Sequence, residues 1–174
     1  MKINYGCGEA KLPGFINIDI EESIKPDVIC DLRKDNFPFD NESVETIYCL
    51  HNLEHIERQF WAHVFTEFRR VLVQDGILVL MYPEFEVCSR YFLENYRGQR
   101  DFWRNCLYGR QLWPGDYHVV PMVSSEVANH LGHCGFKDIK WLPEDENDQY
   151  TIMKAVKGIQ ITKETLLKKE IFHQ

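Results

Sequence analysis

Residues 2–8, Lys2-Ile3-Asn4-Tyr5-Gly6-Cys7-Gly8, read as a short apolar strand that runs directly into a glycine turn. Glycines at such a strand end permit a tight turn and let a ligand approach the backbone closely. The dinucleotide-binding fingerprint needs a third glycine, but Lys11 occupies that position, and too few residues follow Gly8 for a full crossover helix. The stretch therefore predicts a ligand site at the first strand of an α/β sheet and disfavours a pyrophosphate cofactor.

The rest of the chain alternates strand and helix patterns. Residues 56–73 carry apolar side chains at a 3.6-residue period, which predicts an amphipathic helix closed by Gly76. Ser124 is expected to cap a second helix that Gly135 ends. Further strands are predicted at 15–19, 27–31, 44–50, 77–82, 136–142 and 150–156, with an acidic turn at 144–148 between the last two. This order predicts an α/β architecture.

Polar residues follow the ends of the early strands. Asp19 ends the second strand, where a carboxylate can accept hydrogen bonds from both hydroxyls of a ribose. Asp31-Leu32 follows the third strand and offers an acid and a backbone amide to an adenine edge, while Leu50-His51 closes the fourth. Because the carboxyl ends of parallel strands converge, these features are expected to face one crevice. Together they predict a site for a nucleoside without a phosphate.

Composition narrows the class of protein. With 174 residues and 44% hydrophobic side chains, the chain suits one globular domain. The net charge of −7 argues against general electrostatic binding of nucleic acid. No apolar run is long enough to cross a bilayer, and we expect a cytoplasmic protein whose six cysteines are buried free thiols.

The order of these motifs resembles that of class I S-adenosylmethionine-dependent methyltransferases, especially a compact branch with a shortened first crossover. The resemblance spans residues 2–157 and is carried by Asn4–Gly8, Gly14–Asp19, Asp31-Leu32, Phe37–Val44, Leu53–His55, Phe68–Leu72 with Gly76, Tyr108-Gly109, Asp116–His118 and Gly135-Phe136. One departure is Asn4, where the wider family has an acid, so this position can organise the loop but gives no charge to the cofactor.

The resemblance implies a Rossmann-like, mostly parallel seven-stranded sheet with flanking helices, a three-layer sandwich whose seventh strand is antiparallel. It implies S-adenosylmethionine as cofactor, bound by Asn4, Tyr5, Gly6, Cys7, Gly8, Asp19, Ile20, Asp31, Leu32, Leu50 and His51. We expect a methyltransferase domain over residues 1–157, with 84–121 as an insertion or lid over the acceptor site. The tail, 158–174, is expected to form a short helix.

His118 and Tyr117 are the candidate catalytic residues. An imidazole titrates near neutral pH and can serve as a general base, although His118 could equally hydrogen-bond a loop. Tyr117 could shape the acceptor pocket or simply pack. Residues 84–121 hold five arginines, but five acids balance them, so a salt-bridged surface is the alternative to an anion-binding element.

His51-Asn52-Leu53-Glu54-His55 matches the H-x-x-E-H pattern of some zinc peptidases. That chemistry needs both histidines on one helical face, whereas His51 is predicted to follow a strand. We therefore expect no metal. The leading hypothesis is methyl transfer to a small-molecule or glycan-like acceptor, without a nucleic acid or membrane partner. The alternatives are a non-catalytic S-adenosylmethionine-binding module or partner subunit of another methyltransferase, and a zinc hydrolase.

Overall fold

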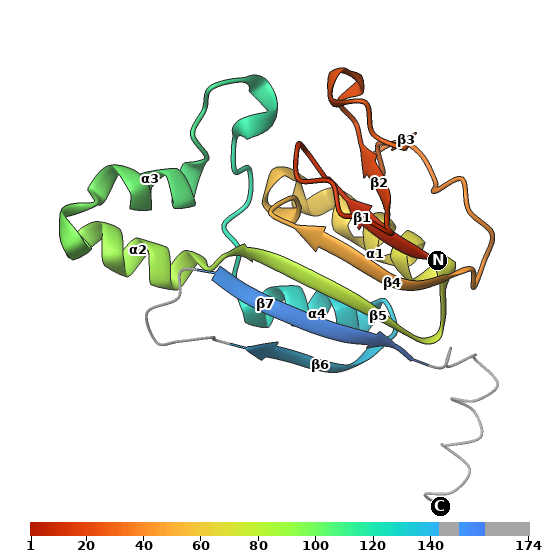
Figure 1. Ribbon diagram of the computed structural model, residues 1–174. Helices are drawn as coiled ribbons and strands as arrows, with labels where there is room; N and C mark the ends of the chain where they lie inside the picture. Colours follow the sequence, from red (N-terminus) through yellow and green to blue (C-terminus); the bar gives the residue numbers. More distant parts are fainter. Residues whose placement is uncertain (143–149, 159–174) are drawn as a thin grey trace, which may run out of the picture.

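The computed structural model describes residues 1–142 and 150–158, which contain a seven-stranded sheet in the order β3-β2-β1-β4-β5-β7-β6 (Figure 1). The strands are β1 (Lys2–Tyr5), β2 (Ile16–Asp19), β3 (Val28–Ile29), β4 (Val44–Leu50), β5 (Leu72–Pro83), β6 (Phe136–Leu142) and β7 (Tyr150–Lys157). β1 to β5 pair in parallel, whereas β7 runs antiparallel to both β5 and β6. The predicted Rossmann-like sheet is thus confirmed.

Of the four α-helices in the described residues, two cover one face of the sheet. The helices are α1 (Trp61–Val71), α2 (Phe85–Leu93), α3 (Arg100–Tyr108) and α4 (Ser124–His133). α1 and α4 lie side by side behind the sheet, whereas α2 and α3 project as an arm from its carboxyl end (Figure 1). The core lies between the sheet and helices α1 and α4, where Ile47, Leu80, Trp61, Phe65 and Leu131 are fully buried.

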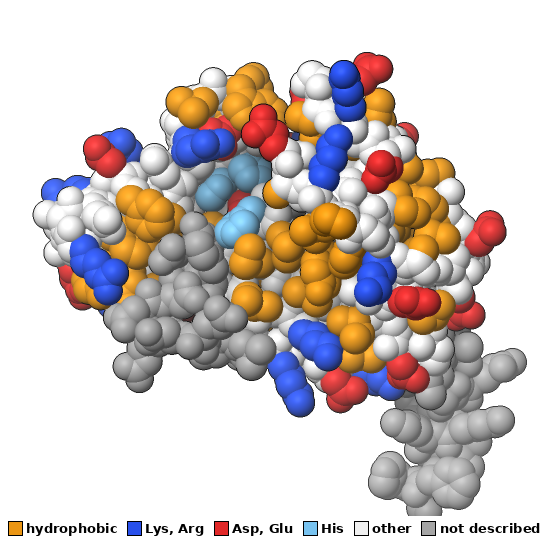
Figure 2. All heavy atoms as spheres, viewed as in Figure 1, with side chains coloured by type: hydrophobic (Ala, Val, Ile, Leu, Met, Phe, Trp, Pro, Cys, Tyr) orange, Lys and Arg blue, Asp and Glu red, His pale blue; other side chains and the backbone are white. Residues whose placement is uncertain are grey.

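The opposite face of the sheet carries no α-helix of the described chain. Tyr48, Val79, Met81, Ile152 and Val156 alternate with the core residues and are half-buried. Figure 2 shows hydrophobic side chains gathered on this face. The described residues therefore form two of the three expected layers, because the early crossovers contain no α-helix.

The predicted helix over 56–73 is shorter than expected. Residues 58–60 form a 3₁₀ turn, and the Ile56 carbonyl accepts a hydrogen bond from Trp61 Nε1 at 3.0 Å, so α1 begins only at Trp61. Gly76 does not close the helix. It lies within β5, at an irregularity where an added Cβ would stand 2.8 Å from the Val73 carbonyl oxygen.

Two other boundaries differ from the sequence prediction. The third strand shortens to Val28–Ile29, and Ser124 is the first residue of α4 rather than its cap. Glu84 Oε1 accepts a hydrogen bond from the Ser124 amide at 3.3 Å, and Glu84 Oε2 accepts one from the Ser124 hydroxyl. A carboxylate distant in sequence thus caps this helix. The acidic turn and the tail helix lie outside the described residues. No helix in the described ranges is both long and apolar enough to cross a membrane.

Candidate active site

The turn after β1 places the backbone of Gly6, Cys7 and Gly8 beside β2. The amides of Gly6 and Cys7 donate to the Ile18 carbonyl at 2.8 and 3.0 Å. A Cβ on Gly6 (φ +69°) would overlap the Asn52 side chain, whereas one on Gly8 (φ +49°) would meet nothing within 4 Å. Gly6 is therefore required where two loops meet, and Gly8 leaves open space beside the backbone for a ligand.

Two buried asparagines hold this turn where the crossover helix is missing. Asn4 and Asn17 are register partners, and Asn4 Nδ2 donates to Asn17 Oδ1 (3.0 Å) and the Ala10 carbonyl (3.1 Å). Asn17 donates to Asp27 Oδ2 from its backbone amide (2.8 Å) and from Nδ2 (3.1 Å). Asn4 thus organises the loop from beneath, as the sequence suggested, rather than presenting its amide to a ligand.

Asp19 ends β2 and faces the glycine turn. Its Oδ2 accepts from the Gly8 amide at 2.8 Å, and Oδ1 accepts from the Glu21 amide at 3.0 Å. Because a carboxylate has about four acceptor sites, about two remain for the hydroxyls of a ribose. Ile20 follows with 46% of its surface exposed and offers an apolar contact beside them. This corner fits the predicted nucleoside.

Asp31 and Leu32 have partners other than an adenine ring. The Leu32 amide donates to Tyr5 Oη at 3.2 Å, and burial raises the pKa of the Tyr5 hydroxyl, which stays protonated. Both Asp31 oxygens accept from Arg33, at 2.8 and 2.9 Å. Burial raises the pKa of Asp31, but the Arg33 hydrogen bonds outweigh it and hold that pKa below its usual range. These residues fix the loop after β3.

The end of β4 lies on the other side of the glycine turn. Leu50 is half-buried, and His51 follows it with φ +52° and an amide that donates to the Met81 carbonyl at 2.8 Å. His51 Nδ1 lies 3.6 Å from Glu54 Oε1. Cys7, within the glycine turn, is buried, and burial raises the pKa of its thiol, so the thiol remains uncharged.

The predicted catalytic residue His118 packs against His55, a residue that the sequence analysis considered only in the zinc-hydrolase alternative. Their rings meet edge to face, with centroids 4.9 Å apart. His118 Nδ1 donates to the Cys106 carbonyl at 3.0 Å, and His55 Nδ1 donates to the Tyr117 carbonyl at 2.9 Å. Because a carbonyl can only accept, each neutral imidazole keeps Nε2 as an acceptor. Burial lowers the pKa of His118, which favours this neutral form. Tyr117 itself is 45% exposed, and its carbonyl orients His55.

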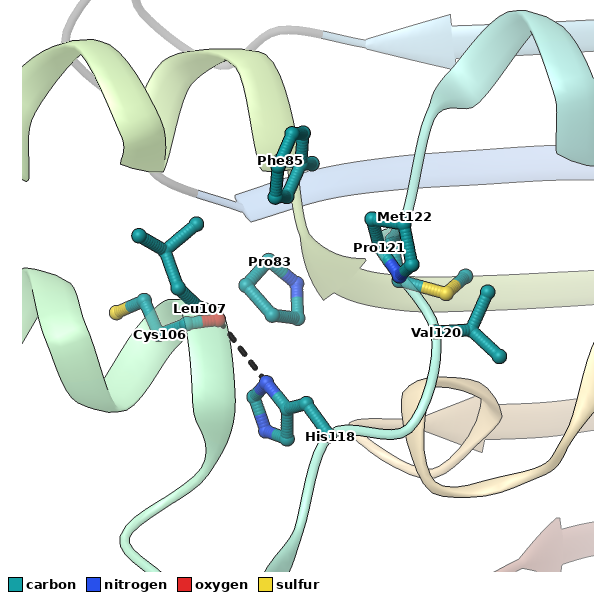
Figure 3. A pocket seen from close by; sticks show the side chains of 8 residues that line it. All are labelled: Pro83, Phe85, Cys106, Leu107, His118, Val120, Pro121 and Met122. Atoms are coloured by element: carbon teal, nitrogen blue, oxygen red, sulfur yellow. Dashed lines mark hydrogen bonds between the residues drawn. The ribbon is translucent and has the colours of Figure 1, made fainter.

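A pocket opens beside His118, between the arm and the end of β5. It holds about 170 Å³ of empty space open to solvent and is lined by Pro83, Phe85, Cys106, Leu107, His118, Val120, Pro121 and Met122. Figure 3 shows His118 at its edge, with Nδ1 turned toward the Cys106 carbonyl. A Cβ on Gly109 would overlap the Asp116 carbonyl, so this glycine lets α3 lie close to the segment that carries His118.

The α2–α3 arm has a small core of its own, formed by Cys88, Tyr91, Trp103 and Cys106. Its charges are paired in part, with Arg104 3.2 Å from Asp101 and Arg110 3.4 Å from Asp116. This pairing favours a salt-bridged surface over an anion-binding element.

Comparison with known proteins agrees with the fold. Residues 14–80 match the family model of the methyltransferase domain. A methyltransferase from Archaeoglobus fulgidus superposes with a TM-score of 0.64 at 16% identity, covering 90% of this chain and 85% of that one. One from Methanosarcina mazei gives 0.60 at 14% identity, covering 91% and 92%. A possible histamine N-methyltransferase from Thermotoga maritima gives 0.58 at 12% identity, covering 90% and 81%. No curated protein matches the sequence.

The matched segment, residues 14–80, and the superposed structures show that the chain shares its fold with S-adenosylmethionine-dependent methyltransferases. This similarity makes S-adenosylmethionine the expected cofactor. The residues present fit this cofactor, since Gly8 leaves space beside the backbone and Asp19 keeps free acceptor sites.

The sequence prediction gave no individual role to Asn17 and Asp27, and it considered Asn52 and the buried Glu54 only within the H-x-x-E-H pattern. The sequence signal that could have identified these residues is a polar side chain at a position where a strand interior or a buried turn normally carries an apolar one.

Proposed function

We propose that the protein transfers the methyl group of S-adenosylmethionine to a small-molecule or glycan-like acceptor. The observation that carries this proposal is the contact between the glycine turn and Asn52, because Asn52 begins the short segment that bears Glu54 and His55 beside the His118 pocket. A cofactor in the glycine turn would thus lie next to the hollow beside His118, where we place the acceptor.

When bound, the cofactor supplies an activated methyl group on sulfur, so the protein has to position the acceptor and exclude water. We assign ribose binding to Asp19 and the glycine turn. The apolar walls at Pro83, Phe85 and Met122 would exclude water, and His118 Nε2 would hydrogen-bond the acceptor. Tyr117, exposed at the rim, is proposed to contact the acceptor by its ring.

A transfer assay tests this function. The protein is incubated with S-adenosylmethionine labelled in its methyl group and a panel of phenols, hydroxy acids, amines and sugars. We expect transfer to a subset of them, lowered at least tenfold in His118→Gln and unchanged in the control His133→Gln on α4. Cofactor binding without transfer to any acceptor, together with a stable complex with a second protein, would instead support the non-catalytic module.

A further inference from the structure

Glu54, His55 and His118 form a cluster of metal-ligating groups at the carboxyl end of β4. One donor atom from each lies within 4.8 Å of the other two. Figure 2 shows histidine side chains in a hollow between the arm and the sheet. The sequence alone led us to expect no metal here, because His51 follows a strand, but the third member comes from a segment more than sixty residues away.

The buried Glu54 side chain is only partly compensated by its neighbours in the described residues. Its side chain is 1% exposed, and Oε2 has no hydrogen-bond partner in the described part of the chain. The ion pair found for it there is with His51 Nδ1, 3.6 Å from the other oxygen. A buried carboxylate is costly unless a cation or hydrogen-bond donors compensate it, so the free oxygen favours a cation in this space.

Both histidines are oriented as metal ligands are. A metal-binding imidazole normally donates its other ring N–H to a carbonyl or carboxylate, which fixes the tautomer. His55 and His118 each do so through Nδ1 to a backbone carbonyl, which leaves Nε2 as the ring nitrogen that can bind an ion. The Val119 amide donates to the Glu54 carbonyl at 2.9 Å and locks the two segments together.

We propose that Glu54, His55 and His118 bind a divalent transition-metal ion such as Zn²⁺. Two imidazole nitrogens and one carboxylate oxygen suit zinc, with a fourth position left open. Ligands about 2.1 Å from a tetrahedral ion stand about 3.4 Å apart, so the donors would close by up to about 1.4 Å, within reach of side-chain rotations. This set uses His118 in place of His51 and so differs from the H-x-x-E-H hydrolase pattern.

With His118 Nε2 bound to the ion, the acceptor would bind the open position of the metal in place of a hydrogen bond to His118. The open position would select acceptors that offer an oxygen donor. A hydroxyl bound there would lose its proton to water more readily, because the cation stabilises the oxyanion. The class of acceptor would then be hydroxyl-bearing compounds. This consequence rests on the proposed methyl transfer, whereas binding of the metal itself does not.

Calorimetric titration of the chelator-treated full chain with ZnCl₂ tests the site. We expect one Zn²⁺ per chain, with affinity lowered at least tenfold in both Glu54→Gln and His118→Gln and unchanged in His133→Gln. MnCl₂ and MgCl₂ serve as comparison ions, and weaker binding of Mg²⁺ is expected because its preferred ligands are oxygens.

Anomalous diffraction at the zinc edge gives a second measurement on the intact protein, with a peak expected among the three side chains. Absence of stoichiometric zinc, or zinc affinity unchanged in both variants, overturns the site. Affinity for S-adenosylhomocysteine is measured on the same samples. If that affinity persists without zinc binding, the cation site fails and cofactor binding stands, and the transfer assay then decides methyl transfer separately.

Discussion

At the scale of single residues, Gly6 and Gly8 lie in the same turn but carry different constraints. Both have positive φ, which costs a non-glycine residue about 1–2 kcal/mol, but only at Gly6 would a Cβ also overlap Asn52. We expect Gly8→Ala to lower the free energy of unfolding by about 1 kcal/mol and Gly6→Ala by about 3 kcal/mol or more. Urea unfolding of the two variants measures the difference. Equal losses would mean that the Asn52 contact does not constrain the turn.

The same scale shows what sequence can predict of the site. The glycines and Asp19 were predictable because a strand end restricts both their conformation and their direction. The hydrogen-bond network around Asn17 and Asp27 was not predictable, because its partners are loop carbonyls and amides that only the folded chain brings together. The hydrogen bond of the Leu32 amide to Tyr5 Oη was not predictable for a related reason, since Tyr5 lies 27 positions away.

At the scale of elements, an ion pair within α1, between Glu67 and Arg70, anchors the loop after β3. Glu67 Oε1 accepts from Arg70 Nε at 2.8 Å, and Oε2 accepts from the Phe37 amide at 3.0 Å. Arg70 also donates to the Phe37 and Phe39 carbonyls at 2.9 and 2.8 Å. The pair thus fixes a segment that has no helix of its own.

The pH dependence of stability reports on this pair. Burial raises the pKa of Glu67, but the bonds from Arg70 and Phe37 outweigh it, so its pKa lies below the usual range. A lowered pKa stabilises the fold above the unfolded value of about 4.3, and this gain is lost as pH falls through the folded value.

We therefore expect Glu67→Gln to lower the free energy of unfolding by about 1–3 kcal/mol at pH 7 and by less below about pH 4. Denaturant unfolding at both pH values tests this, with the exposed Glu45→Gln as control. A difference that stays constant with pH would refute the role of the charged pair.

Element types were predicted better than their ends. The periodicity of residues 61–71 and the apolar run of β5 are local signals, and both elements formed. The start of α1 and the place of Gly76 depend on a Trp61 side chain that bonds a backbone carbonyl and on an irregular pairing with β4. Such tertiary contacts produce no periodic pattern in the sequence.

At the scale of the whole molecule, the sheet has one face covered by helices and one open. Leu80 is fully buried against α1 and α4, while its neighbour Met81 is half-buried on the other face. Leu80→Ala should lower the free energy of unfolding by about 2–5 kcal/mol, and Met81→Ala by less than about half as much. Chemical denaturation of both variants distinguishes the faces. A loss at Met81 as large as that at Leu80 would show that a further layer covers the second face.

The central claim is that the glycine turn and Asp19 bind S-adenosylmethionine. Calorimetric titration with S-adenosylhomocysteine tests it most directly. We expect one site per chain, weakened about 10- to 100-fold in Asp19→Ala, since hydrogen bonds to a charged group contribute about 1.5–3 kcal/mol, and unchanged in the exposed control Glu22→Ala. No binding by the intact, folded protein would contradict the account.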